Sequence, residues 1–254
     1  MNVIILAAGM GSRMGHLTNH EPKCFLKVDG LRLIERLIKQ LREIGLMDIS
    51  IVTGYKAKKF KFKDVNFFYN KEFKSTNMVY SLMKAKKKLN DDTLVVYSDI
   101  IVSKKILKKM ISKKYKRKLA VAVDTQWKKY WAFRFKDINQ DLESLKINSK
   151  NQITELGREL NSIDQIDGRF IGVVRFSKNI NKFFLDMWKE ETDKNKKNWG
   201  ISGRSFNKAY MTDLINNLIN LKIKCSAVLF KNGWYEFDNK NDYFKFKKYK
   251  LLNL

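Results

Sequence analysis

The chain has 254 residues, of which 44% are hydrophobic and 13% aromatic, a composition that excludes an intrinsically disordered protein. It carries 52 Lys and Arg against 26 Asp and Glu, and no run of about 18 apolar residues indicates a transmembrane helix. The sequence has only two cysteines, Cys24 and Cys225, and no cluster of Cys and His residues, so it supports neither a disulfide scaffold nor a zinc module. Because few cysteines are typical of a reducing compartment, we expect a cytoplasmic protein. The N-terminal residues lack the basic region of a signal peptide and are predicted to form a strand.

The net charge of +26 allows two interpretations. One is a basic nucleic-acid-binding protein. However, only ten of the 52 cations are arginines, which read phosphate and guanine best, and the lysines are spread along the whole chain. We therefore favour a solvated basic surface that attracts a small polyanion, and we expect neither a nucleic acid nor a membrane as a partner.

In the first half of the chain, short apolar runs alternate with segments of helical periodicity. Strands are predicted at residues 3–6, 49–52, 65–69, 93–97 and 119–123. Helices are predicted at residues 31–41, 78–89 and 106–111, with Ser75 or Thr76 as the N-cap of the second. This alternation is typical of an α/β fold with a Rossmann-like mixed, mostly parallel sheet and helices on both faces.

After about residue 125 the pattern changes. Half-exposed antiparallel strands are predicted at residues 131–135, 144–147 and 152–155, a buried strand at 170–174, and helices at 180–188 and 214–221. No linker, internal repeat or low-complexity segment separates the two parts. We therefore predict one domain over residues 1–254, in which a small antiparallel region within 126–254 follows the parallel sheet of 1–125.

A loop of small residues follows the first predicted strand. Residues 6–13 read Leu-Ala-Ala-Gly-Met-Gly-Ser-Arg, and Pro22, the only proline in the chain, precedes Lys23. Without Cβ interference, backbone N–H groups of such a loop approach phosphates closely, and open α/β sheets bind ligands at this end of their strands. Met14 replaces the third glycine of the dinucleotide fingerprint, and no Gly-Lys-Ser/Thr of a P-loop follows. Arg13 and Lys23 remain as cations that can neutralise a triphosphate.

The loop resembles the signature of the nucleotidyltransferases that activate small phosphorylated compounds. Together with residues 54–55, 76–82, 97–99 and 234–238, it is most similar to the phosphocholine and phosphonate cytidylyltransferase branch. The resemblance covers nearly the whole chain and implies the fold of the nucleotide-diphospho-sugar transferases, with nucleotide binding in 1–125 and acceptor binding in 126–254. It also implies that CMP from CTP is joined to an acceptor such as phosphocholine or 2-aminoethylphosphonate, with release of pyrophosphate.

The resemblance also assigns roles to single residues. Asp99 and Asp238 would bind Mg²⁺, whereas Asp242 is a weaker candidate that can equally begin a helix. Lys23 would contact the α-phosphate and the acceptor, and Arg13 the β- and γ-phosphates. No general base is needed, because the attacking oxygen is already anionic. The nucleotide-binding residues implied are Leu6, Ala7, Ala8, Gly9, Gly11, Ser12, Gly54, Thr76, Asn77, Ser81 and Ser98.

Aromatic and acidic residues cluster late in the sequence. The acceptor-binding candidates are Trp131, Tyr210, Asp213, Trp234 and Glu236. An aromatic box with carboxylates suits a quaternary or primary ammonium group, although the aromatic residues can equally belong to the core. If Arg134, Arg169 or Arg175 enters the pocket, a phosphorylated amino acid becomes an attractive acceptor. A sugar-1-phosphate nucleotidyltransferase that uses UTP or dTTP is the alternative enzyme, and the sequence leaves a homodimer open.

Overall fold

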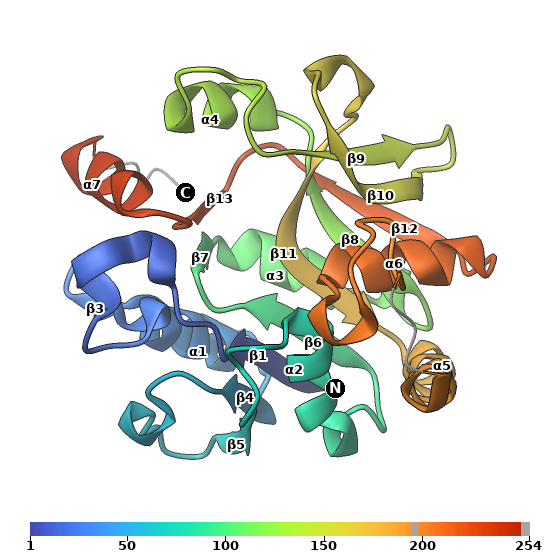
Figure 1. The fold of residues 1–254 in the computed structure, drawn as a ribbon, viewed down its shortest axis with the longest axis horizontal. Helices are drawn as coiled ribbons and strands as arrows, with labels where there is room; N and C mark the ends of the chain where they lie inside the picture. Colours follow the sequence, from blue (N-terminus) through green and yellow to red (C-terminus); the bar gives the residue numbers. More distant parts are fainter. Residues whose placement is uncertain (195–197, 250–254) are drawn as a thin grey trace.

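The computed structural model describes residues 1–194 and 198–249 (Figure 1). Among these residues, nine strands form a central sheet in the order β5-β4-β1-β6-β11-β8-β12-β10-β9. In chain order these strands are β1 (Asn2–Ala7), β4 (Ile49–Thr53), β5 (Asn66–Tyr69), β6 (Thr93–Tyr97), β8 (Leu119–Asp124), β9 (Leu142–Ile147), β10 (Gln152–Leu160), β11 (Arg169–Phe176) and β12 (Cys225–Phe230). Two small antiparallel pairs accompany it, β2 (Lys27–Val28) with β3 (Leu31–Arg32) and β7 (Ile100–Val102) with β13 (Trp234–Glu236).

The central sheet is mixed and mostly parallel, as predicted. Strand β1 pairs in parallel with β4 and β6, β4 with β5, and β12 with β8. Only β10 and β11 run against the other strands, since each pairs antiparallel with both of its neighbours. Consequently β1, β4 and β6 all end at one edge of the sheet, which is where such sheets bind their ligands.

Helices cover both faces of the sheet, because its strands are apolar on both sides. The helices are α1 (Leu33–Glu43), α2 (Met78–Lys84), α3 (Lys104–Met110), α4 (Trp127–Arg134), α5 (Lys178–Lys194), α6 (Met211–Asn220) and α7 (Lys240–Tyr249). Val3 and Ile5 of β1 face the core beneath α1 and α3, whereas Ile4 faces the core beneath α2, α5 and α6. A third apolar cluster, which includes Met14 and Phe237, packs beneath α7.

Most predicted elements are confirmed, but residues 131–135 do not form a strand. Residues 131–134 belong to helix α4, after which Phe135 is the C-cap, and within this helix Trp127, Trp131 and Arg134 are buried at a spacing of four and three residues. An alternation of apolar and polar residues over only five positions fits a short strand and one helical turn equally well, so this pattern alone does not distinguish the two. The predicted N-cap of α2 is also wrong, because Asn77 takes this position and accepts a hydrogen bond from the Met78 backbone.

The predicted antiparallel region is continuous with the central sheet. Strands β9 and β10 pair with each other, and Ile153 of β10 lies opposite Cys225 of β12. The sheet therefore takes strands from both sides of residue 125. Within residues 1–194 and 198–249, no helix is long and apolar enough to cross a membrane.

Candidate active site

A cavity of about 280 Å³ opens where β1 and β6 end. It brings together ten of the eleven predicted nucleotide-binding residues, which come from the glycine-rich loop, from the start of α2 and from the end of β6. Its walls are formed by Leu6, Ala7, Ala8, Gly9, Gly11, Ser12, Arg13, Lys23, Cys24, Phe73, Thr76, Asn77, Met78, Ser81, Tyr97, Ser98, Asp99 and Asp238. The sequence pattern did not single out Phe73 or Met78, which add apolar surface to one wall.

The glycines shape the loop in two different ways. Gly11 has a φ of 64°, and a Cβ at this position would lie 2.9 Å from the Cβ of Lys23. Gly54 is the predicted residue outside the cavity wall: a Cβ there would lie 2.6 Å from the Ala8 carbonyl, which also accepts a hydrogen bond from the Tyr55 backbone. Gly11 thus permits the close approach of Lys23, and Gly54 supports the loop from behind.

The side of the cavity formed by α2 depends on Asn70, which the sequence analysis missed. Its fully buried amide donates hydrogen bonds of 3.0 Å to the hydroxyl groups of both Thr76 and Ser81. Asn70 directly follows β5, so a polar residue at the carboxyl end of a strand was the available signal.

Lys23 brings the two predicted magnesium ligands together. Its Nζ lies 2.7 Å from Asp99 Oδ2 and 3.5 Å from Asp238 Oδ1. Burial lowers the pKa of the ammonium group, but the two carboxylates outweigh this and raise the pKa above its ordinary value. Lys23 is therefore a fixed positive charge in the cavity wall.

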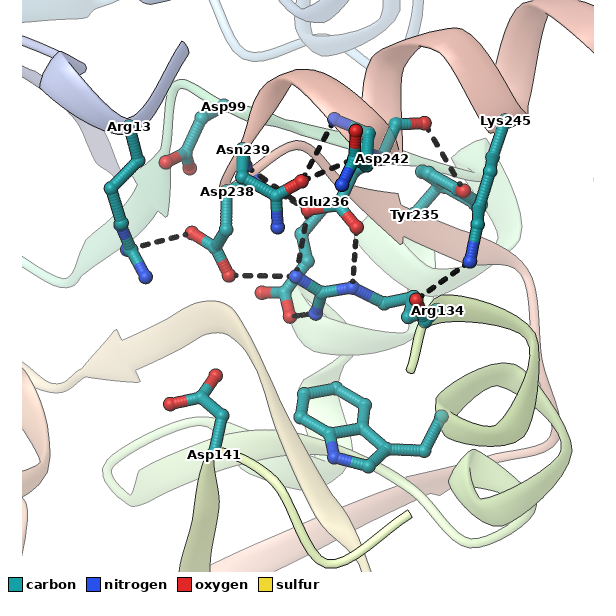
Figure 2. A network of polar contacts seen from close by, with 12 residues as sticks. Arg13, Asp99, Arg134, Asp141, Tyr235, Glu236, Asp238, Asn239, Asp242 and Lys245 are labelled. Carbon is teal, nitrogen blue, oxygen red and sulfur yellow. Dashed lines mark hydrogen bonds and ion pairs between the residues drawn. The ribbon is translucent and has the colours of Figure 1, made fainter. Parts of the chain in front are cut away.

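Asp238 is held by cations on three sides. Arg13 Nη2 lies 3.2 Å from one of its carboxylate oxygens, and Arg134 Nη2 lies 3.0 Å from the other (Figure 2). Burial raises the pKa of the carboxyl group, but Lys23, Arg134 and Arg13 outweigh it and hold the pKa well below its usual range. The group is therefore an anion at neutral pH.

Behind Asp238, the buried guanidinium of Arg134 joins three acidic side chains (Figure 2). It forms ion pairs with Glu236 and Asp238 and a bidentate pair with Asp242, whose two oxygens lie 3.1 and 2.9 Å away. Asp242 also accepts backbone hydrogen bonds from Asp238 and Asn239 at the start of α7. Because these contacts already use its carboxylate oxygens, the structure favours Asp242 as a residue of the first turn of helix α7 over Asp242 as a metal ligand.

Asp99 and Asp238 fit a magnesium ion by their chemistry. Both carboxylates line the cavity, and both already contact a cation, the Lys23 ammonium. Among the described residues no three His, Cys, Asp or Glu side chains gather into a metal cage. Such a cage is not required, because Mg²⁺ is commonly held by one or two carboxylates together with substrate phosphates and water.

A second, larger cavity of about 720 Å³ adjoins the first. Arg13, Met78, Tyr97 and Asp238 line both cavities. The second cavity is rich in charge of both signs, and its charged lining consists of Arg13, Asp141, Glu143, Glu159, Arg169, Arg204, Glu236 and Asp238. Two ligands bound in these cavities would therefore meet beside Asp238.

Two of the predicted acceptor residues, Tyr210 and Glu236, lie in this second cavity, but the predicted tryptophans do not. Trp131 is fully buried and donates from Nε1 to the Gln140 carbonyl at 2.8 Å. Trp234 is buried as well and donates from Nε1 to Asp124 at 2.9 Å. The aromatic box predicted from the sequence is therefore wrong, since both rings belong to the core.

The prediction that Asp213 binds the acceptor is also wrong. It is fully buried, and its carboxylate accepts hydrogen bonds from the backbones of Ser202 and Tyr210. This places it in the capping box at the start of α6, a common structural role for an acidic residue in the first helical turn.

Of the three arginines considered from the sequence, Arg169 alone lines the second cavity. Arg134 lies behind Asp238, and Arg175 is remote, pairing with Asp92 at 2.8 Å. Arg204 lines the same cavity as Arg169 and was missed, because it lies in an irregular segment without a recognisable motif.

Comparisons with known proteins identify the family and the fold of the chain. The family model described as MobA-like NTP transferase domain matches residues 3–160. The chain is 32% identical over 253 residues to the CTP:phosphoglutamine cytidylyltransferase of Campylobacter jejuni, covering 95% of this chain and 97% of that protein. It is 33% identical over 132 residues to the choline-phosphate cytidylyltransferase of Haemophilus influenzae, covering 50% of this chain and 56% of that protein. The solved structure of a CTP:phosphocholine cytidylyltransferase from Streptococcus pneumoniae is similar in fold, with a TM-score of 0.71, 21% identity and 98% of both chains covered.

Proposed function

Because the chain belongs to the MobA-like NTP transferase family, we propose that it transfers CMP from CTP to a small phosphorylated acceptor and releases pyrophosphate. The similarity to cytidylyltransferases supports CTP as the donor. Phosphoglutamine, named for the Campylobacter jejuni relative, is the first acceptor to consider, followed by phosphocholine and 2-aminoethylphosphonate. The observation that carries this proposal is the meeting of the two cavities at Asp238 and Arg13.

The reaction requires no base from the protein. A phosphate oxygen of the acceptor attacks the α-phosphorus of CTP and forms a new phosphorus–oxygen bond. The bond to the oxygen that bridges the α- and β-phosphates breaks, and its electron pair leaves with pyrophosphate. Because the second ionisation of a phosphate monoester has a pKa of about 6, the attacking oxygen is already anionic at neutral pH.

The protein instead aligns two anions and stabilises their charge. Lys23, held between Asp99 and Asp238, would contact the α-phosphate while charge develops there. The Arg13 side chain is 67% exposed and contacts Asp238 where the cavities join, so it can reach the leaving phosphates. Asp99 and Asp238 would hold Mg²⁺, which when bound screens the repulsion between phosphate groups.

A pyrophosphate-release assay tests the proposal. The protein is incubated with Mg²⁺, one of CTP, UTP or dTTP, and a panel of phosphocholine, phosphoethanolamine, 2-aminoethylphosphonate, phosphoglutamine and glucose 1-phosphate. We expect turnover with CTP and at least one of the first four acceptors. Turnover confined to UTP or dTTP with the sugar phosphate would instead establish the sugar-1-phosphate enzyme, and no release with any pair would refute nucleotidyl transfer.

A variant pair distinguishes catalysis from nucleic-acid binding. Asp99→Asn should lower turnover by roughly 10²–10³, whereas Asp64→Asn, at an exposed position, should leave it unchanged. A protein whose role is to bind nucleic acid through its charge would show salt-dependent duplex binding that Asp99→Asn does not alter, and no turnover.

A further inference from the structure

Arg169 lines the second cavity, which we take as the acceptor cavity of the proposed function, and one nitrogen of its guanidinium is unpaired within the described residues. It lies at the start of β11 with its side chain 11% exposed, and its guanidinium lies 4.0 Å from the centre of the Trp131 ring. One nitrogen, Nη2, is 3.7 Å from the carboxylate of Asp141. The other, Nη1, is buried and has no hydrogen-bond partner within the described part of the chain. A buried charged donor without an acceptor is costly, so this nitrogen is suited to a ligand oxygen.

Arg204 provides a second cation in the same cavity. Its guanidinium lies 4.4 Å from the centre of the Tyr210 ring, and both side chains line the cavity. Stacking on an aromatic ring fixes the plane of a guanidinium and so prepares it for planar, bidentate recognition of a carboxylate or phosphate. Since Lys23 and Arg13 already serve the phosphates in the proposed function, Arg169 and Arg204 point to a further anionic group on the acceptor.

Glu143 provides the opposite charge. It lines the same cavity on β9. Burial raises the pKa of its carboxyl group, Arg169 lowers it, and the nearby Asp141, Asp213 and Glu159 raise it further. An added cation, such as the ammonium group of a ligand, would stabilise the charged form of the Glu143 carboxylate.

Resting on the proposed function, we infer that the acceptor is a phosphorylated α-amino acid, and that Arg169 binds its α-carboxylate while Glu143 binds its α-ammonium. A carboxylate oxygen would supply the missing partner of Arg169 Nη1. Phosphocholine and phosphoethanolamine carry no carboxylate, and their binding would leave this nitrogen desolvated and unpaired. Arg169 is thus a specificity-determining residue.

Matched acceptor pairs test this inference with CTP and Mg²⁺. Phosphoserine differs from phosphoethanolamine only by its carboxylate, and phosphoglutamine is compared with the same molecule lacking the α-carboxylate. We expect kcat/KM for the carboxylate-bearing member of at least one pair to exceed that of its partner by about tenfold or more, mostly through KM. 3-Phosphoglycerate, which has a carboxylate but no ammonium group, should be a poorer acceptor than phosphoserine.

The variants examine Arg169 directly. Arg169→Gln should reduce the ratio of kcat/KM within the preferred pair at least tenfold, and Arg169→Lys, which keeps the charge, should restore part of it. Arg158→Gln is the control, because Arg158 pairs with Glu155 at the surface and lines neither cavity. Thermal unfolding of each variant shows whether the fold is retained.

The outcomes separate the two proposals. If the wild-type protein uses carboxylate-free acceptors as well as their counterparts, or if Arg169→Gln leaves the ratio unchanged, the inference is overturned and the cytidylyltransferase stands. If no acceptor yields pyrophosphate, the proposed function fails and the inference fails with it.

Discussion

The Lys23 ammonium lies 2.7 Å from the carboxylate of Asp99, joining two segments that are 76 residues apart in sequence. Lys23 comes from the turn that follows Pro22, and Asp99 from the end of β6. Each group neutralises the charge of the other in a partly buried site. The triphosphate of the proposed function, bound with its cation, would offer each of these two groups a new partner of opposite charge.

Replacing Lys23 by Gln should therefore lower kcat by roughly 10²–10³, because a donor aimed at the developing charge is lost. KM for CTP should change less than kcat. Lys27→Gln removes an exposed lysine four residues away and is the matched control. Steady-state pyrophosphate release measures both variants, and equal kcat values for the two would contradict the role of Lys23.

The stability of the protein should depend on pH through Asp238. The pKa of this carboxyl group is lower in the folded protein than its ordinary value of 3.8, chiefly because Lys23 and Arg134 outweigh its burial. Its contribution to stability is then fully present above about pH 4 and is lost as the pH falls towards the folded pKa. Urea unfolding without metal should show that the difference between wild type and Asp238→Asn shrinks below pH 4. A difference that stays constant down to pH 2 would argue against this ion pairing.

Arg134→Met should destabilise the fold by about 3–5 kcal/mol, because it leaves Asp242 and its acidic neighbours buried without their cation. The double variant Arg134→Met/Asp242→Asn removes one of the stranded charges and should recover part of the loss. Urea unfolding at pH 7 measures both free energies. A cost below about 0.5 kcal/mol for the single variant would show that the network contributes nothing to stability.

Much of the lining of the first cavity could be predicted from the sequence because these residues lie at strand ends and in a loop of small residues. Leu6 to Ser12 form the end of β1 and the loop after it, and Ser98 and Asp99 directly follow β6, so a local pattern defines their place in the sheet. The same reasoning found Lys23, since a single proline beside it marked a fixed backbone.

Only part of the lining of the second cavity, namely Tyr210, Glu236 and Arg169, could be predicted from the sequence. The partners of Arg134 lie 102 to 108 residues further along the chain, and its burial depends on helix α4, which the short alternation disguised as a strand. Trp131 and Trp234 are residue types that form aromatic boxes, but both rings are buried in the core of this fold. Which polar groups line the second cavity thus depends on long-range packing, which a local sequence pattern does not reveal.

Replacing Asn70 tests whether its hydrogen bonds maintain the α2 side of the first cavity. Asn70→Ala removes two hydrogen bonds that orient Thr76 and Ser81, so we expect KM for CTP to rise about tenfold and stability to fall by about 1–3 kcal/mol. Asn66→Ala, at an exposed position on β5, should change stability by less than about 0.5 kcal/mol. If the two variants bind CTP equally well, the α2 side of the cavity does not depend on Asn70.

Gly11→Ala tests whether the loop determines the position of Lys23. Gly11 and Gly30 both have positive φ values, 64° and 79°, so alanine costs roughly 1–2 kcal/mol of backbone strain at either position. Only at Gly11 does the added Cβ also meet the Lys23 Cβ, at 2.9 Å, whereas nothing lies within 4 Å at Gly30. Gly11→Ala should therefore lose at least as much stability as Gly30→Ala, and it alone should lose roughly 10² in kcat, since a displacement of about 1 Å has that effect on an aligned group. Equal kcat values in the two variants would mean that the loop tolerates the added methyl group without moving Lys23.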